Sequence, residues 1–280
     1  MNDDNFQTII NEMVKSALHE DIGTGDITAA LIPKGSHAKA VILAREPAIL
    51  CGQAWVNTTF SQIDPGITIN WHASDGEPLL TDQHICSIEG PARNLLSGER
   101  TALNFLQTLS GTATTTQRYV KKIDGLPVKL LDTRKTIPGF RIAQKYAVRC
   151  GGGHNHRIGL YDAILIKENH IAACGSIQQS VMKARQLSPG INIEVEVETL
   201  SELQQALTAQ ADTILLDNFD IENLEAAVAL NKKQAQLEAS GGITLDTIYS
   251  IAETGVDAIS TGALTKDIRA IDLSMLFIEP

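Results

Sequence analysis

Apolar residues at the start of the chain recur with the spacing of a helix and then give way to short runs separated by turns. One helical stripe between residues 5 and 19 contains Phe6, Ile9, Ile10, Met13, Val14, Ala17 and Leu18. The glycines of EDIGTGDIT interrupt this pattern, and four short strand-like runs follow: KAVILAR, AILCG, ITINW and ICSIEG. The pattern predicts an amphipathic helix followed by a small α+β domain with mostly antiparallel strands.

Residues 92–110 have the spacing of a second helix. Its inward stripe contains Leu95, Ala102, Leu106 and Leu109, whereas Glu99 and Arg100 lie off that stripe. We therefore expect these two charged residues to face something other than the core beneath the helix. The first domain is expected to cover residues 1–110, and the tail 268–280 is expected to pack on it.

From about residue 112 the pattern changes to short apolar runs that are each followed by a helical segment. The runs are VKLLDT, AILI, INIEVEV, TILLD, QLEAS and AIST. Such alternation predicts parallel βα units over residues 111–267, in a barrel or a doubly wound sheet. The clear strands are too few for a standard eight-stranded barrel, which points to an open or reduced one.

Composition places the chain among ordinary globular proteins, with 43% apolar and 20% charged residues. No apolar run reaches the ~18 residues of a membrane span, and the start MNDDNFQ carries acids where a signal peptide carries Lys or Arg. We therefore expect a cytoplasmic protein. The net charge of −10 disfavours nucleic acid and acidic membranes as partners.

One segment reverses this acidic balance. Between Thr133 and Lys167 there are seven basic residues and a single acid, Asp162. Three of the basic residues, Arg141, Lys145 and Arg149, are spaced four apart and have an alternative interpretation as a solvated helix face. That interpretation fits the other four less well: Arg134, Lys135, Arg157 and Lys167.

Polar groups follow nearly every strand of the second domain, and in a βα barrel these strand ends meet at one rim where active sites lie. Two of them are glycine-containing loops, Ser240–Gly242 and Thr261–Ala263. Their backbone amides could bind phosphate, as loops after the last two strands of such barrels do. The alternative is a pair of helix caps without a ligand.

Cationic and imidazole groups follow two other strands. The stretch Thr133, Arg134, Lys135 and the stretch ending in His156 and Arg157 suit carboxylates or phosphates, and Lys167 follows a third strand. His154 and His156 could instead bind a metal ion, but no third ligand is evident beside them.

Three glutamates, Glu194, Glu196 and Glu198, alternate along one predicted strand and therefore share one side of it. An outward charged strip is the alternative, but the outer face of a barrel strand meets helices, so we favour the inward side. With Asp217 after the next strand, they could bind sugar hydroxyls and magnesium or stabilise positive charge. Spacing alone does not decide which glutamate matters.

Several long stretches resemble the quinolinate phosphoribosyltransferases, the carboxylating type of nicotinate-nucleotide pyrophosphorylase. They are EDIGTGDIT, ERTALNFLQTLSG, LLDTRKTIPGFRIAQKYAV, GGGHNHRIGLYDAILIKENHI, EVEVETL, ILLDNF, ASGGI and TGVDAISTGAL, and the match runs from about residue 19 to 266. The resemblance implies a type II phosphoribosyltransferase fold, an N-terminal α/β sandwich plus an open α/β barrel, in a homodimer with shared sites. It also implies the reaction of quinolinate with phosphoribosyl pyrophosphate and magnesium to nicotinate mononucleotide, pyrophosphate and carbon dioxide, without an organic cofactor.

The resemblance also assigns roles to residues. Quinolinate carboxylates would bind to Arg134, His156, Arg157 and Lys167, and Arg100 would reach the partner subunit's site. Phosphoribosyl pyrophosphate and its magnesium would bind to Lys135, Glu196, Asp217, Ser240, Gly241, Gly242, Thr261, Gly262 and Ala263. Glu196 and Asp217 would hold the magnesium, and Lys135, Lys167, Glu196 and Asp217 would be the catalytic group. Thr261 departs from the family pattern, which has a small apolar residue there.

Other functions fit parts of the same pattern. A paralogue associated with molybdenum-transport operons shares the fold, and a nicotinate-specific transferase would bind one carboxylate rather than two. The number of cations argues for two carboxylates. A metabolite-binding module without turnover is the non-enzymatic alternative.

Overall fold

The structure is a computed structural model that describes residues 3–278, with side chains from residue 5. The chain forms two units. The N-terminal unit extends through Thr115 and also includes Arg149–Gly151 and the chain from Ile268, and the barrel unit comprises Thr116–Val148 and Gly152–Asp267. The domain boundary expected near residue 110 falls inside a continuous helix, α3 (Ala92–Lys122).

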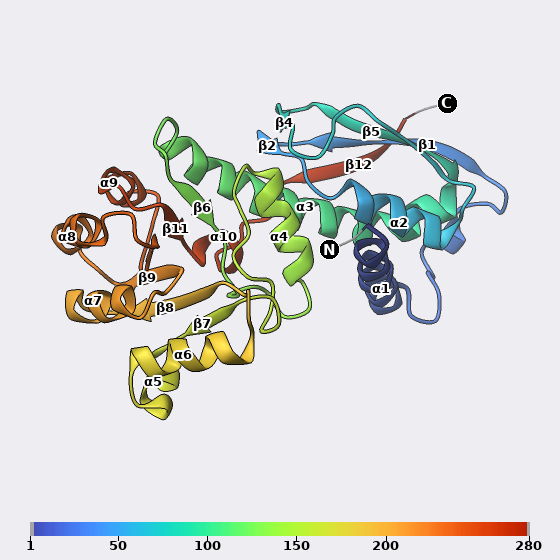
Figure 1. The fold of residues 1–280 in the computed structure, drawn as a ribbon. Helices are drawn as coiled ribbons and strands as arrows, with labels where there is room; N and C mark the ends of the chain where they lie inside the picture. The colour runs from blue at the N-terminus through green and yellow to red at the C-terminus, as the bar shows by residue number, and fades with distance from the viewer. Residues whose placement is uncertain (1–2, 279–280) are drawn as a thin grey trace. The chain divides into compact units, whose positions relative to one another are not determined.

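In the N-terminal unit an antiparallel sheet of order β12-β1-β5-β3 packs on helices (Figure 1). Its core joins apolar residues of the sheet to those of α2 and α3, among them Ile42, Ile88, Phe60 and Leu103. The four predicted runs correspond to strands, whereas α2 and β12 were not predicted as elements. The elements are α1 (Asp3–Ile22), η1 (Ala29–Leu31), β1 (His37–Ala44), β2 (Ala48–Ile49), α2 (Gln53–Ile63), β3 (Thr68–Trp71), β4 (Pro78–Leu79), β5 (His84–Pro91), α3 (Ala92–Lys122) and β12 (Leu273–Ile278).

Helix α3 is longer than the sequence indicated. It begins at Ala92 as expected but continues past Ser110 to Lys122. The Thr-rich stretch after Ser110 favours a helix end by propensity, but Thr112 and Thr116 are buried, so tertiary packing outweighs that preference. Gly111 is required within the helix because a Cβ there would lie 2.3 Å from the carbonyl oxygen of Arg269.

The barrel unit contains six parallel strands in the order β6-β11-β10-β9-β8-β7, with helices on their outer side (Figure 1). All six predicted strands are confirmed, and each is followed by a helix. The elements are β6 (Lys129–Leu131), α4 (Arg141–Cys150), β7 (Ile164–Ile166), α5 (Glu168–Cys174), α6 (Ile177–Leu187), β8 (Ile193–Val197), α7 (Leu200–Thr208), β9 (Thr213–Asp217), α8 (Ile221–Asn231), β10 (Gln236–Ser240), α9 (Ile248–Glu253), β11 (Ala258–Ser260) and α10 (Ala263–Lys266).

The barrel is open rather than closed. Strands β6 and β7 are the two edges of the described sheet. Beside β6 the chain at His154 makes one further parallel bridge with Leu131, so the segment before Arg157 partly extends this edge. The predicted open α/β barrel is therefore confirmed.

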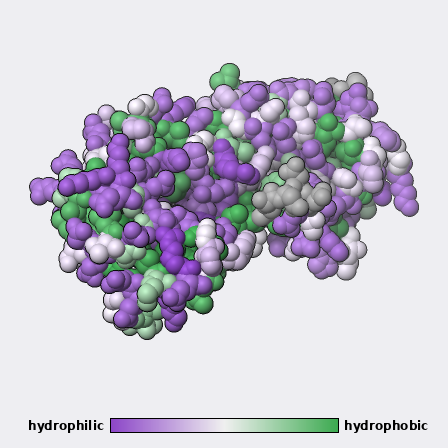
Figure 2. Space-filling model, in the orientation of Figure 1, coloured by the Kyte–Doolittle hydropathy of each residue, from purple (hydrophilic) through white to green (hydrophobic). Residues whose placement is uncertain are grey.

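Among the described residues, no helix is both long and apolar enough to cross a membrane. The face seen in Figure 2 is largely hydrophilic, and its apolar residues form separate groups rather than one continuous band.

Candidate active site

The carboxyl ends of the six barrel strands surround a cavity of about 220 Å³. This is the rim at which a βα barrel places its chemistry. The cavity is lined by Thr133, Arg134, Lys135, His156, Arg157, Leu165, Lys167, Glu196, Leu215, Asp217, Glu238, Ser240 and Ser260. Nine predicted residues are therefore gathered at one place: Thr133, Arg134, Lys135, His156, Arg157, Lys167, Glu196, Asp217 and Ser240.

The segment carrying His156 and Arg157 is anchored to β6 by a buried ion pair. Asp132, directly after β6, binds the Lys145 ammonium and accepts hydrogen bonds from the Asn155 side chain (2.6 Å) and the backbone N–H of His156 (2.9 Å). Lys145 also donates to the carbonyl oxygen of His156 (2.9 Å). The interpretation of Lys145 as part of a solvated helix face is therefore wrong, because its side chain is buried and organises the loop.

Arg141 at the start of α4 joins the two cationic loops to each other. Its guanidinium donates to the Thr136 hydroxyl (3.1 Å), the Arg134 carbonyl (3.4 Å) and the Ile158 carbonyl (3.1 Å). The solvated interpretation is thus wrong for Arg141 as well. Arg134 itself has a buried Nε without a hydrogen-bond partner among the described residues, which leaves a donor available for an anion.

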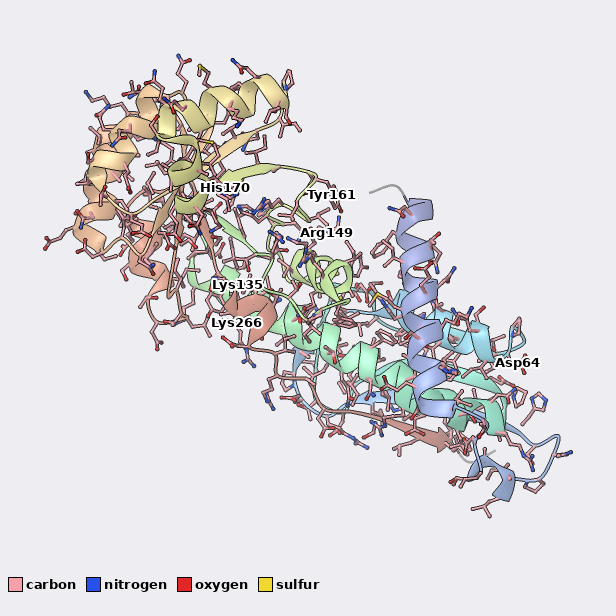
Figure 3. The ribbon with its side chains drawn as sticks, turned by 90° about the horizontal axis from the view of Figure 1, so that it is seen from below. Asp64, Lys135, Arg149, Tyr161, His170 and Lys266 are labelled. Carbon is pink, nitrogen blue, oxygen red and sulfur yellow. The ribbon has the colours of Figure 1, made fainter. Side chains whose placement is uncertain are left out.

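Lys167, directly after β7, and Glu196, on the neighbouring strand β8, form an ion pair in the wall of the cavity. Lys167 is held at the start of α5, where its backbone N–H donates to Nδ1 of His170 (3.0 Å), which is labelled in Figure 3. On the next strand, burial and the charge of Glu196 raise the pKa of Asp217, while Lys167 and Lys135 oppose that rise. Glu196 and Asp217 are therefore two neighbouring carboxylates with cations around them.

The carboxylate pair fits a divalent cation chemically. Magnesium prefers carboxylate oxygens, and a cation between the two groups would offset the repulsion that raises the pKa of Asp217.

Of the three alternating glutamates, Glu194 and Glu196 both point into the barrel, as predicted. Glu198 lies beyond β8 and is exposed.

The two glycine loops border the rim. Gly241 has a φ of +100°, and a Cβ on it would lie 2.2 Å from Oδ1 of Asn218, so only glycine fits. Gly262 lies against Lys135, whose backbone carbonyl accepts a hydrogen bond from Thr265 of α10, and Figure 3 labels Lys135 beside this helix. These loops therefore bring backbone amides close to the Lys135 side of the cavity.

Thr261, the departure from the family pattern, is buried, and its hydroxyl donates to the Ile243 carbonyl (3.1 Å). The hydroxyl is thus used within the protein. Gly241, Gly242, Thr261, Gly262 and Ala263 do not line the cavity itself. Arg100 is exposed on α3 in the N-terminal unit.

His156 lies at the centre of the barrel between two glutamates. Its Nε2 is 2.9 Å from Glu194 Oε2 and 3.5 Å from Glu238 Oε2, and its Nδ1 accepts a hydrogen bond from the backbone N–H of Arg157 (2.8 Å). Burial alone would lower the pKa of His156, but the hydrogen bond to Glu194 and the charge of Glu238 outweigh it and raise that pKa. Both ring nitrogens are therefore engaged inside the protein.

A second cavity, of about 500 Å³, opens at the amino ends of the same strands and is lined by residues such as Lys129, Thr213 and Gln236. His156, Arg157 and Glu238 line both cavities and so separate them. We place the substrate in the smaller cavity, because the predicted cations and carboxylates converge there.

Comparison with known proteins decides the family. The quinolinate phosphoribosyl transferase N-terminal domain matches residues 26–110, and its C-terminal domain matches residues 112–276. The chain belongs to the quinolinate phosphoribosyltransferase family. Its fold is the type II phosphoribosyltransferase fold, as predicted.

Relatives from distant organisms agree with this family. A solved nicotinate-nucleotide pyrophosphorylase from Francisella tularensis is 50% identical, with a TM-score of 0.94 and 97% of each chain covered. A probable carboxylating nicotinate-nucleotide pyrophosphorylase of Bacillus subtilis is 46% identical over 91% of this chain and 89% of its own length. A mitochondrial quinolinate phosphoribosyltransferase of Nicotiana tabacum is 37% identical over 95% and 81%, respectively. Neither the molybdenum-operon paralogue nor the nicotinate-specific transferase is favoured.

In this family member, sequence reasoning missed four residues that shape the site: Glu238, Asp132, Lys145 and Arg141. Glu238 is in the middle of an apolar strand run, QLEAS, where a single charged residue in a buried strand was an available signal. The other three act through contacts with segments distant in sequence, which spacing does not reveal.

The metal-binding alternative for His154 and His156 also changes, because His156 groups with Glu194 and Glu238 rather than with His154.

Proposed function

We propose that this protein transfers the phosphoribosyl group of phosphoribosyl pyrophosphate to the ring nitrogen of quinolinate, with loss of carbon dioxide, to form nicotinate mononucleotide and pyrophosphate. The reaction follows from family membership, since both domains of the quinolinate phosphoribosyltransferases match the chain. The observation that carries the assignment of residues is one cavity that is lined both by cations and by a carboxylate pair.

The cationic side suits a planar dicarboxylate. Arg134 and Arg157 offer guanidinium groups, and Lys167 adds a point charge. His156 borders the same cavity. Because Lys167 is paired with Glu196, a quinolinate carboxylate that binds Lys167 would compete with this pair and free Glu196 for the sugar.

The opposite side suits phosphoribosyl pyrophosphate. Ser240, Gly241 and Gly242, together with Thr261, Gly262 and Ala263, would hold phosphate through backbone amides, and Lys135 would neutralise charge on the leaving pyrophosphate. Glu196 and Asp217 would hold magnesium or the ribose hydroxyls. Bound magnesium would supply charge neutralisation at the pyrophosphate.

The chemistry then needs position and charge rather than a general base. The pyridine nitrogen is already nucleophilic, so the protein's task is to hold it against the anomeric carbon. Glu196 and Asp217 stabilise the positive charge that develops on the ribose as pyrophosphate departs. Once the ring nitrogen is quaternised, its positive charge stabilises the electron pair that the breaking carbon–carboxylate bond leaves on the neighbouring carbon. Carbon dioxide leaves, and a proton from water takes its place on that carbon.

Turnover with quinolinate, phosphoribosyl pyrophosphate and magnesium tests this proposal. We expect nicotinate mononucleotide by mass spectrometry together with carbon dioxide, and no product from nicotinate. The substitution Lys167→Gln removes the charged contact between Lys167 and a quinolinate carboxylate. It should lower kcat/KM for quinolinate about 10- to 100-fold. Product from nicotinate alone, or no product from either acid, would contradict the assignment.

The oligomeric state and the location of the protein are further parts of the proposal. A homodimer in which Arg100 reaches the partner subunit's site accounts for a charged residue off the apolar stripe of α3. The cytoplasmic location expected from the sequence stays a prediction.

A further inference from the structure

His156, Glu194 and Glu238 form a buried cluster in which two carboxylate oxygens lack a hydrogen-bond partner among the described residues. The side chains of Glu194 and Glu238 are only 6% and 3% exposed, and Oε1 of each has no hydrogen-bond partner among the described residues. A buried, unpaired carboxylate oxygen is costly, so the two groups need either a proton or a cation between them.

The hydrogen bonds around His156 decide its protonation pattern. The backbone N–H of Arg157 can donate to Nδ1 only while that nitrogen carries no proton. In the neutral ring, the form present above the pKa of His156, the proton is then on Nε2, where Glu194 accepts it at 2.9 Å. A proton shared by Glu194 and Glu238 would give each carboxyl group the partner it lacks, and Ser260 of β11 is the further group that hydrogen-bonds to Glu238.

We propose that Glu238 is a positioning residue for substrate binding: with Glu194 it orients the His156 ring, which in turn fixes the main chain at Arg157. This inference rests on the proposed function, because Arg157 is the group that would meet a quinolinate carboxylate. His156 lines the same cavity, so the contacts that orient its ring also fix its place beside the substrate.

Two variants of equal size separate positioning from mere packing. Glu238→Gln keeps a group that can donate a hydrogen bond to Glu194, whereas Glu238→Met fills the same volume without one. We expect the KM for quinolinate to rise at least about tenfold in Glu238→Met and less than about threefold in Glu238→Gln. The KM for phosphoribosyl pyrophosphate should change little in either variant. Glu225→Gln, at an exposed position of α8, is the matched control.

The histidine tautomer provides a readout that a packing role would not change. In the wild-type protein above the pKa of His156, nitrogen NMR of labelled histidine should show the neutral ring with its proton on Nε2, and Glu238→Gln should keep that pattern. Glu238→Met leaves Glu194 without its hydrogen-bonded neighbour, so Glu194 should no longer hold the ring in place and both neutral tautomers should appear, with thermal melting as the check on folding. Because this measurement needs no turnover, it tests the positioning role even if the protein fails to use quinolinate.

Three results would overturn the proposal. The first is a neutral His156 ring with its proton on Nδ1 in the wild-type protein, which requires no variant at all. The second is an equal rise of both KM values in the two variants. The third is a stoichiometric transition metal that purified wild-type protein retains and Glu238→Met loses, because the ligand atoms of the cluster lie within 4.8 Å of one another and could hold one.

Discussion

At the scale of single residues, Glu238 gives the site a proton that titrates near neutrality. Burial and the neighbouring Glu194 raise the pKa of Glu238 to about 7, while His156 and a hydrogen bond from Ser260 oppose that rise. Below this pH the group is neutral, and above it two adjacent carboxylates are charged beside the pocket for a dianion. The affinity for quinolinate should therefore fall as the pH rises through the pKa of Glu238.

The KM for quinolinate, measured on both sides of that pKa, tests the expectation. It should rise by about threefold to tenfold on the alkaline side in the wild-type protein. Glu238→Gln has no proton to lose and should remove this rise. The same alkaline rise in Glu238→Gln would assign the titration to another group.

At the scale of elements, the loop after β10 needs glycine at position 241 more than at position 242. Gly241 has a left-handed φ, and a Cβ there would collide with Oδ1 of Asn218 at 2.2 Å, whereas Gly242 has a φ of +61° and no atom within 4 Å of a Cβ. Gly241→Ala therefore adds a collision to the backbone strain, while Gly242→Ala adds strain alone.

The two substitutions form a matched pair. Gly242→Ala should cost about 1 kcal/mol of unfolding free energy, and Gly241→Ala about 2–4 kcal/mol together with a higher KM for phosphoribosyl pyrophosphate. Thermal or denaturant unfolding and steady-state kinetics measure both effects. Equal losses of stability in the two variants would show that the loop moves to accept a side chain at Gly241.

Elements were predicted well where the local pattern and tertiary packing agree. The six strands of the barrel unit have short apolar runs bounded by turns, so their existence could be read along the chain. The end of α3 could not be predicted from the sequence, because Thr112 and Thr116 stay helical only through their burial. Gly111 is needed only because the Arg269 carbonyl lies close to it.

At the scale of the whole molecule, the shared-site proposal requires two chains for one active site. Arg100 and Lys167 belong to different units of the chain, so a hybrid dimer could contain one site with both residues intact. Mixing inactive Arg100→Ala and Lys167→Ala proteins under subunit exchange should restore roughly a quarter of wild-type activity, because half the dimers are hybrids and each has one complete site. No recovery despite demonstrated exchange would contradict sharing of the site.

The sequence by itself determined the fold class, the family and most of the residues around the cavity, because periodicity, strand-end polarity and long motifs are local properties of the chain. Only the tertiary structure showed that Asp132 and Lys145 anchor the loop of His156, that Arg141 joins two loops, and that Glu238 faces Glu194. These pairs are separated along the chain by up to several strands. Their meeting depends on how the parallel strands are ordered and in which register they pair, and neither is encoded in the spacing of any single segment.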